Sequence, residues 1–334
     1  MPKPEILVTH NFEERHRGIF EEIIGDSAGV VFLADVSEKE RADALSRADV
    51  VISWSAAKEF RPEEFRLLGG VRLVQFLTAG VNHAPLESLP RGATVASVPG
   101  AYAEPMAEHI TGMILALAKR LCVCHAKLKG GEFDQSTRNR MLRGMTCGVL
   151  GFGGIGQAAS KILRAFSVRI YAINTSGTTT EPVDFIGTLE ALDFILEHSD
   201  IVLISLPLNL RTKGLISDRE LGLMKPDGIL INVARGAIVD QRALYTRLVQ
   251  FPDFRAGIDA WWVEPGTSGE FRVDYPFFDL PNVLGSPHNS AVVPGVMGTA
   301  VRMAVENVMR FLKGEKVRGV VRREDYIKGW ERQG

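Results

Sequence analysis

Short runs of apolar residues alternate with amphipathic segments along almost the whole chain. The apolar runs have the length of buried strands, and the segments between them have the spacing of surface helices. This alternation is typical of a parallel sheet covered by helices. In the first third of the chain, the predicted strands are Ile6–Thr9, Val30–Leu33, Val50–Ser53, Leu73–Phe76 and Val95–Val98, and the predicted helices include Phe12–Ile24 and Lys39–Ser46.

A second series of the same kind begins at Thr146. We therefore expect an α/β protein with two doubly wound parallel-sheet units, and short crossings between them near residues 100 and 290. The predicted strands of the second series are Thr146–Leu150, Arg169–Ile173, Ile201–Ser205, Gly228–Val233, Arg255–Asp259 and Val283–Leu284, and its helices are Leu189–His198, Asp218–Met224 and Gln241–Val249.

A long helix is predicted between the two series, from Pro105 to about Leu128. Its apolar residues, among them Met113, Leu117 and Leu121, cover more than one face. We therefore expect the helix to pack on two sides and to help bury a two-fold dimer interface. The last predicted helix is Val296–Leu312, with Gly314 as its C-cap.

The strand Thr146–Leu150 leads directly into a Gly-x-Gly-x-x-Gly motif, and a helical pattern follows from Ile155. In this context Gly151 permits a tight turn, Gly153 allows backbone to approach a pyrophosphate, and Gly156 lets the helix pack against the strand. The helix N-terminus directs free N–H groups and a partial positive charge at the phosphates. The motif and its context predict a dinucleotide site.

Composition narrows the class of protein. With 334 residues, 46% hydrophobic and 24% charged, the chain has the profile of a soluble globular protein with two domains. The net charge is -1, from 39 basic and 40 acidic residues, so neither nucleic acid nor an anionic membrane is expected as a partner. The N-terminus lacks a signal-peptide apolar segment, and we expect a cytoplasmic protein.

The cysteines do not indicate a metal site or a disulfide framework. Cys122, Cys124 and Cys147 are an odd number in apolar surroundings, and no Cys/His cluster has zinc spacing. We expect buried, reduced thiols and no bound metal.

Three segments after the glycine motif carry candidate chemistry. Arg235 follows a predicted strand, where a guanidinium can bind a carboxylate with two parallel hydrogen bonds, although a purely structural ion pair is the alternative. Glu264 and His288 each follow a later strand. A carboxylate next to an imidazole orients the ring and favours its protonated form, which a carbonyl reduction needs as general acid.

In this order, these motifs make the chain resemble the D-isomer-specific 2-hydroxyacid dehydrogenase family. The motifs are the glycine loop, Asn-Val-Ala-Arg-Gly at 232–236, Glu264-Pro265 and Pro287-His288. Two further segments are similar to the family: Leu77-Thr78-Ala79-Gly80-Val81 resembles its substrate-carboxylate loop, and Ala107-Glu108-His109 resembles the start of its dimer-forming helix. The similarity extends over essentially the whole chain.

The resemblance implies a Rossmann domain of residues 100–287 that binds NAD(P), and a flavodoxin-like substrate domain formed by residues 1–99 and 288–334. It implies Arg235 as anchor of the substrate carboxylate and carbonyl, His288 as general acid/base, and Glu264 as its partner. The substrate would also contact Ala79, Gly80 and Val81. The implied cofactor contacts are Gly151, Gly153, Gly154, Ile155, Gly156, Asn174, Thr175, Ser176, Leu206, Pro207, Val233, Ala234 and Asp259, the last facing the nicotinamide ring. The chain length leaves no room for the regulatory domain of some phosphoglycerate members.

Two departures from the family affect cofactor and substrate. NAD-preferring members place an Asp eighteen residues past Gly156, where this chain has Asn174, followed by Thr175 and Ser176. A carboxylate there would repel a 2′-phosphate, so its absence favours NADP(H), although no Arg follows as in many NADP users. Tyr102 stands where many members have Asn, which leaves the size of the substrate open.

The expected activity is hydride transfer between a nicotinamide cofactor and a small 2-oxo acid or D-2-hydroxy acid, such as glyoxylate or hydroxypyruvate, in a homodimer. Phosphoglycerate and bulkier 2-oxo acids remain open as substrates. Formate dehydrogenases carry Gln where Glu264 stands, which disfavours that activity. A dinucleotide-sensing interaction protein, like the corepressor relatives of this family, is the alternative from another class.

Overall fold

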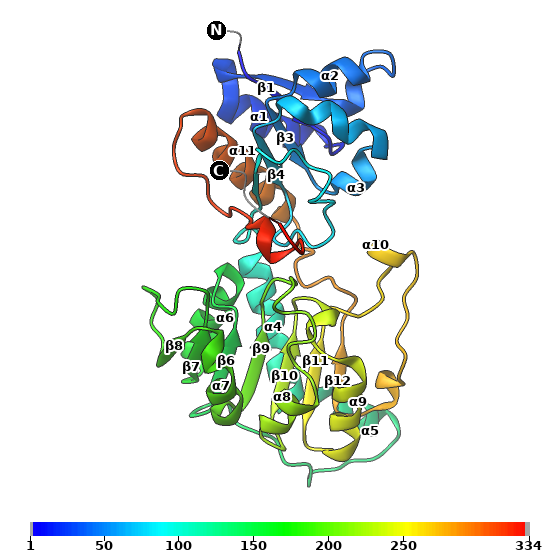
Figure 1. Cartoon of the computed structure of the whole chain (residues 1–334). Coiled ribbons are helices and arrows are strands. Elements are labelled where there is room, and N and C mark those ends of the chain that lie inside the picture. Colours follow the sequence, from blue (N-terminus) through cyan, green and yellow to red (C-terminus); the bar gives the residue numbers. More distant parts are fainter. Residues whose placement is uncertain (1–2, 331–334) are drawn as a thin grey trace. The chain divides into compact units, whose positions relative to one another are not determined.

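The computed structural model describes residues 3–330 and divides the chain into two compact units. Unit 1 consists of residues 1–102 and 293–334, and unit 2 of residues 103–292 (Figure 1). From the family resemblance we expected the domain boundaries to follow residues 99 and 287. The observed bounds place His288 in unit 2. Within the described part of the chain, no helix is long and apolar enough to cross a membrane.

Unit 1 contains a five-stranded parallel sheet in the order β2-β1-β3-β4-β5, the flavodoxin-like order. Its inner strands are completely buried apolar runs, as expected when helices cover both faces. Helices α1 and α11 pack together, and α11 also packs on β4. The strands are β1 (Glu5–Val8), β2 (Gly29–Phe32), β3 (Val50–Ser53), β4 (Leu73–Phe76) and β5 (Thr94–Ala96), and the helices are α1 (Glu14–Ile24), α2 (Arg41–Arg47), α3 (Ala56–Glu59) and α11 (Val296–Leu312).

Unit 2 contains a seven-stranded parallel sheet in the order β12-β11-β10-β9-β6-β7-β8. Helices α4 and α6 pack together, and α4 also contacts β10 and β11, while α7, α8 and α9 contact one another in sequence. The strands are β6 (Thr146–Leu150), β7 (Arg169–Ile173), β8 (Phe185–Gly187), β9 (Ile201–Ile204), β10 (Ile229–Asn232), β11 (Arg255–Ile258) and β12 (Val283–Gly285). The helices are α4 (Ala103–Ala118), α5 (Leu121–Lys129), α6 (Gly154–Ala165), α7 (Leu192–His198), α8 (Asp218–Leu223), α9 (Gln241–Gln250) and α10 (Pro265–Ser268).

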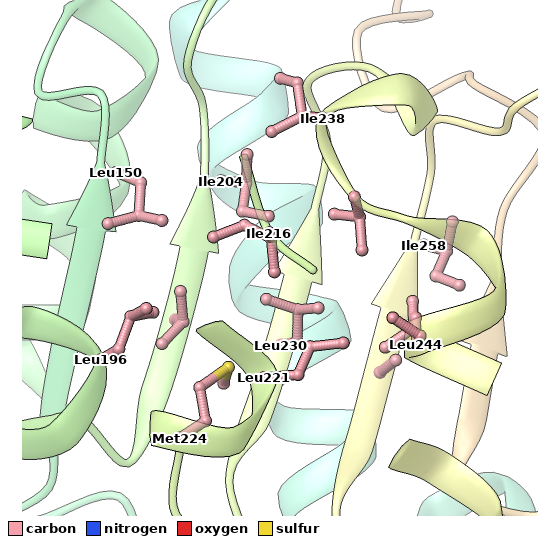
Figure 2. Close-up of a cluster of buried hydrophobic side chains, with 14 of the residues drawn as sticks. Leu150, Leu196, Ile204, Ile216, Leu221, Met224, Leu230, Ile238, Leu244 and Ile258 are labelled. Atoms are coloured by element: carbon pink, nitrogen blue, oxygen red, sulfur yellow. The ribbon is translucent and has the colours of Figure 1, made fainter. Parts of the chain in front are cut away.

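One apolar core lies between the sheet of unit 2 and helices α7, α8 and α9 (Figure 2). Strand residues such as Leu150, Ile204 and Leu230 meet helix residues such as Leu196 and Leu244, and all five are at most 1% exposed. Full burial of such a side chain contributes about 1.5–3 kcal/mol. This core anchors the strands whose carboxyl ends carry the motifs described below.

The single helix expected from Pro105 to Leu128 is wrong. Helix α4 ends at Ala118 and α5 begins at Leu121, because Arg120 adopts a left-handed backbone conformation with φ of 48°. Most apolar residues of α4 are buried in the chain, whereas α5 has no buried residue. Sequence periodicity did not reveal the break because both helices contain apolar residues.

The expectation of buried thiols is also wrong for one cysteine. All three thiols are free, but Cys122 is exposed on α5, Cys124 is partly buried, and only Cys147 on β6 is fully buried. Burial raises the pKa of the Cys147 thiol to about 12, so this thiol stays protonated.

Candidate active site

The glycine motif forms the turn between β6 and α6. Gly151 has a φ of 102°, and a Cβ at this position would lie 2.8 Å from the backbone nitrogen of Leu206. At Gly156, a Cβ would lie 2.5 Å from the carbonyl oxygen of Gly151. Both positions therefore need glycine for the turn itself. The Ser205 hydroxyl donates a hydrogen bond of 2.8 Å to the Gly151 carbonyl, which ties the end of β9 to the loop.

Gly153 differs because nothing in the fold of the chain requires it. Its φ of -93° is open to any residue, and no other group of the described chain lies within 4 Å of where its Cβ would be. The free space lies at the N-terminus of α6, where the N-cap makes no side-chain hydrogen bond. A glycine next to uncapped N–H groups leaves room for a pyrophosphate. These residues therefore fit a nicotinamide dinucleotide.

The segment after β7 is a turn organised by Asn174. Its side-chain oxygen accepts hydrogen bonds from the backbone N–H groups of Ser176 (3.1 Å) and Gly177 (2.7 Å), and its amide donates to the Thr178 carbonyl (2.8 Å). Asn174 therefore shapes the loop that also carries Thr175. The carboxylate typical of NAD-preferring relatives is missing here.

Arg235 follows β10 and is held by Asn232. The side chain of Asn232 accepts from the Ala234 N–H (3.1 Å) and donates to the Arg235 carbonyl (3.0 Å). The next residue, Gly236, lies so close to the loop after β11 that a Cβ there would be 2.3 Å from the carbonyl carbon of Trp261. The guanidinium donates to the Ala234 carbonyl (2.7 Å) and is half-buried.

Glu264 and His288 form the pair that the sequence predicted. Nδ1 of His288 lies 2.9 Å and 2.8 Å from the two carboxylate oxygens of Glu264. Glu264 also accepts from the Trp261 N–H (2.7 Å), which fixes the carboxylate relative to β11. Since Nδ1 is occupied, Nε2 is the nitrogen that can exchange a proton with a substrate. The His288 side chain is 36% exposed.

The electrostatics of Glu264 suit this role. Burial alone would raise the pKa of its carboxyl, but the hydrogen bonds from His288 and from the Trp261 N–H, with the charges of His288 and Arg235, lower it overall. Glu264 is therefore a carboxylate at neutral pH and accepts from Nδ1 of His288 in this charged form.

Asp259 holds the segment that carries His288. Its carboxylate is completely buried and accepts from the Ser286 hydroxyl (2.6 Å) and the backbone N–H groups of Asn289 (3.1 Å) and Ser290 (3.3 Å). The Asp259 carbonyl accepts from the His288 N–H (3.0 Å). These bonds hold His288 in a left-handed conformation with φ of 51°, which is uncommon for a residue other than glycine. The nicotinamide contact expected of Asp259 stays a prediction.

The sequence did not predict a second group of residues around Asp259 as part of the site. Nε2 of His109, on α4, lies 2.9 Å from the Ser286 hydroxyl, and the indole N–H of Trp261 donates to the Ser286 carbonyl (2.8 Å). His109 stood in a segment that the family resemblance identified, and Ser286 directly precedes the Pro287-His288 motif. Their connection across 177 residues was visible only in the structure.

Unit 1 carries the loop predicted to hold the substrate carboxylate. Residues 77–81 follow β4, and the Thr78 hydroxyl donates to the Gly80 carbonyl (2.8 Å). The Tyr102 hydroxyl donates to the Leu77 carbonyl (2.5 Å), so this tyrosine anchors the start of the loop. Ala79 and Gly80 are half-buried, and the side chain of Val81 is buried.

The strand order explains why residues so distant in sequence converge in unit 2. In a parallel sheet the carboxyl ends of all strands lie at the same end of the sheet. Ligands usually bind there, at the point where the strand order reverses. Along this edge follow His288 after β12, Glu264 after β11, Val233, Ala234 and Arg235 after β10, Leu206 and Pro207 after β9, the glycine loop after β6, and Asn174 after β7. The order changes direction between β6 and β9, next to the glycine loop.

Comparisons with known proteins agree with this geometry. The family model for the "D-isomer specific 2-hydroxyacid dehydrogenase, NAD binding domain" matches residues 111–290. The D-3-phosphoglycerate dehydrogenase of Methanocaldococcus jannaschii is 28% identical over 326 residues, which cover 95% of this chain but only 59% of that protein. The glyoxylate reductase of Thermococcus litoralis is 32% identical over 239 residues, 69% of this chain and 70% of that one.

Solved structures show the same fold. A Pyrobaculum aerophilum protein described as a formate dehydrogenase superposes with a TM-score of 0.81 at 27% identity, over 97% of this chain and all of that one.

Proposed function

The chain belongs to the D-isomer specific 2-hydroxyacid dehydrogenase family of oxidoreductases, and we propose that it reduces a small 2-oxo acid to the D-2-hydroxy acid with a nicotinamide cofactor. The observation that carries this proposal is the pair formed by His288 and Glu264. Both carboxylate oxygens hold Nδ1 of the ring and leave Nε2 for the substrate.

Reduction requires a positioned carboxylate, a polarised carbonyl and a proton donor. When bound, the reduced nicotinamide supplies the hydride. We assign the substrate carboxylate to Arg235 and the backbone N–H groups of Gly80 and Val81. Arg235 and His288 polarise the carbonyl. As C2 gains the hydride, His288 transfers its Nε2 proton to the carbonyl oxygen, which leaves a hydroxyl group and a neutral imidazole.

The cofactor we propose is NADP(H). The loop after β7 offers the Asn174 amide and the hydroxyls of Thr175 and Ser176 in place of a carboxylate. Hydroxyl and amide groups can donate to a 2′-phosphate, whereas a carboxylate would repel it. We likewise propose that the protein forms a homodimer.

The test is a steady-state screen of 2-oxo acids with NADH and NADPH, combined with the His288→Ala variant. We expect turnover with small substrates such as glyoxylate or hydroxypyruvate. Loss of the general acid should lower kcat about 100-fold or more, while cofactor binding, measured by nicotinamide fluorescence, stays near the wild-type value. His198→Ala, a histidine on α7, is the control and should leave kcat unchanged.

The same screen separates the alternatives. Phosphoglycerate with oxidised cofactor tests the activity named for the Methanocaldococcus relative, and formate tests the activity named for the Pyrobaculum structure. We expect no turnover of formate, because Glu264 stands where formate dehydrogenases carry Gln. Tight NAD(P)H binding without turnover of any 2-oxo acid would favour a dinucleotide sensor, and near-normal turnover by His288→Ala would remove this residue from the mechanism.

A further inference from the structure

A pocket lies at the end of the unit 2 sheet where the strands begin, whereas the site residues follow the ends of the strands. It has a volume of about 110 Å³ and is lined by the amino-terminal ends of β11 and β12 and by the junction of α4 and α5. Along β11, which has four residues, the pocket and the site residues are separated by about 10 Å. Its lining combines two arginines, a thiol, an asparagine and apolar side chains: Ala116, Leu117, Arg120, Cys122, Val123, Pro252, Arg255, Pro281, Asn282, Val283 and Leu284.

Arg255 is the unusual member of this lining. It is 5% exposed, yet its guanidinium makes one hydrogen bond, from Nη1 to the Leu117 carbonyl at the end of α4 (3.2 Å). It forms no ion pair with any residue of the described chain, although buried arginines are normally paired. Burial, and then the charges of Arg120 and Arg140, lower the pKa of Arg255, and Asp253 and Asp227 offset this in part. Four of its five donors are left for another acceptor.

Arg120 adds a second positive charge with an unused donor. Its Nη2 pairs with Asp253 (2.6 Å), but its Nε is buried and makes no hydrogen bond. Asn282 cannot compete as a donor, because its amide donates to the carbonyls of Leu248 (3.0 Å) and Phe254 (2.7 Å). No Asp or Glu belongs to the lining within residues 3–330. Arg255 therefore brings guanidinium donors without an ion-pair partner in the described chain, next to Arg120, whose partner Asp253 lies outside the lining.

From this geometry we propose that the Arg255–Arg120 pocket binds a small monocarboxylate, with its head on the two guanidiniums and a short apolar tail against Leu117, Val123 and Pro281. A carboxylate can accept two parallel hydrogen bonds from a guanidinium. The pocket is small, with a volume of about 110 Å³, which suits a ligand of a few carbon atoms. The mostly apolar walls favour a carboxylate with a tail over a fully hydrated inorganic anion.

The test uses sodium butyrate as the probe and the Cys122 thiol as the reporter. Alkylation of Cys122 is followed in a Cys124→Ser background, at constant ionic strength with chloride as the replaced anion. We expect butyrate to slow the reaction in a saturable way, acetate to require higher concentrations because it lacks the tail, and inorganic phosphate to be weaker than butyrate. In the Arg255→Met variant, the half-protective concentration should rise about tenfold or more, since a charge-assisted hydrogen-bond partner is lost.

Controls separate the pocket from general anion effects. Arg242→Met removes an arginine on α9 outside the pocket and should leave the protection intact. Cys124, followed in a Cys122→Ser background, does not line the pocket and should react equally with and without butyrate. Arg120→Met should also weaken the protection, and it remains informative if Arg255→Met does not fold. A butyrate-dependent rise in the melting temperature, lost in both pocket variants, is the second readout.

Three results would overturn the proposal. The first is equal Cys122 alkylation with and without butyrate, together with no thermal shift. The second is phosphate protection stronger than that of butyrate. The third is protection that persists in both arginine variants. If the wild-type protein ignores butyrate while Arg255→Met dissociates an oligomer, then an acidic side chain of a second copy occupies the pocket instead. None of these readouts depends on turnover.

Discussion

Glu264 is the residue at which two loops of unit 2 meet. Its carboxylate accepts a hydrogen bond from the Trp261 N–H of its own loop. Both carboxylate oxygens also contact Nδ1 of His288, which follows a different strand. Because hydrogen bonds and the neighbouring cations lower the pKa of Glu264 despite burial, the group keeps its negative charge through the neutral range. It can therefore stabilise the imidazolium that reduction requires.

Glu264→Gln should shift the pH profile of 2-oxo acid reduction. The amide keeps the shape of the side chain but loses the charge that favours the protonated ring. Reduction uses the protonated ring. As the pH is raised, the activity of the variant should therefore fall at a lower pH than that of the wild type. The measurement is kcat/KM across pH 5–9, with Glu220→Gln, a capping-box carboxylate on α8, as the control. An unshifted profile would assign Glu264 a purely structural role.

At the scale of elements, the loop after β7 determines the cofactor preference that we propose. In Asn174→Asp a carboxylate oxygen can still accept from the N–H groups of Ser176 and Gly177, while the bond to the Thr178 carbonyl is lost. Its charge would face a 2′-phosphate, so kcat/KM for NADPH should fall by roughly tenfold or more, with NADH unchanged or improved. Asn139→Asp, at an exposed site, is the control. If the wild type already prefers NADH tenfold, the interpretation of this loop is wrong.

The break between α4 and α5 redistributes the apolar surface. Met113 and Leu117 on α4 are 4% and 6% exposed, and both lie against Gly257 of β11. They belong to the core of unit 2 and cannot form an interface. By contrast, Leu121 and Leu128 on α5 are 56% and 55% exposed. The unsatisfied apolar surface is therefore on the face of α5 that carries Leu121 and Leu128 and on the segment after it, whereas Cys122 lies on another face of this helix.

At the scale of the whole molecule, this surface is where we place the predicted homodimer. Phe133 and Met141, in the segment after α5, are 77% and 66% exposed, and contiguous patches of exposed apolar side chains are typical of interaction sites. Sedimentation equilibrium at micromolar concentration should give about 73 kDa, twice the 36.7 kDa of the chain, as expected for a two-fold dimer. Leu128→Glu combined with Phe133→Glu should reduce the mass to that of one chain.

The control for this experiment is Val249→Glu, which adds a charge at a half-exposed apolar residue of α9 and should leave the dimer intact. A wild-type protein that sediments as a fully active monomer would contradict the prediction. Leu121 and Leu128 would then be isolated surface residues, which are common in soluble proteins.

The sequence by itself determined the strands and the order of the motifs. The predicted bounds of β3, β4, β6 and β7 and of α11 agree with the structure, because buried parallel strands are uninterrupted apolar runs and α11 has a clear amphipathic pattern. Strand β8 was missed, since Phe185–Gly187 is short and only partly buried. The family was identified correctly because its motifs follow strand ends that are themselves easy to locate.

Only the tertiary structure decided most of the contacts among these residues. The pair of His288 and Glu264 was predicted, but the contact of His109 with Ser286, across 177 residues, was not. Tyr102 supports the loop after β4, and Asp259 holds the His288 segment, although both stood in the sequence as substrate or cofactor candidates. The buried Arg255 also looked like an ordinary strand residue. The local pattern of apolar and polar residues indicates whether a residue is buried. Its contact partners depend on the order of the strands in the sheet.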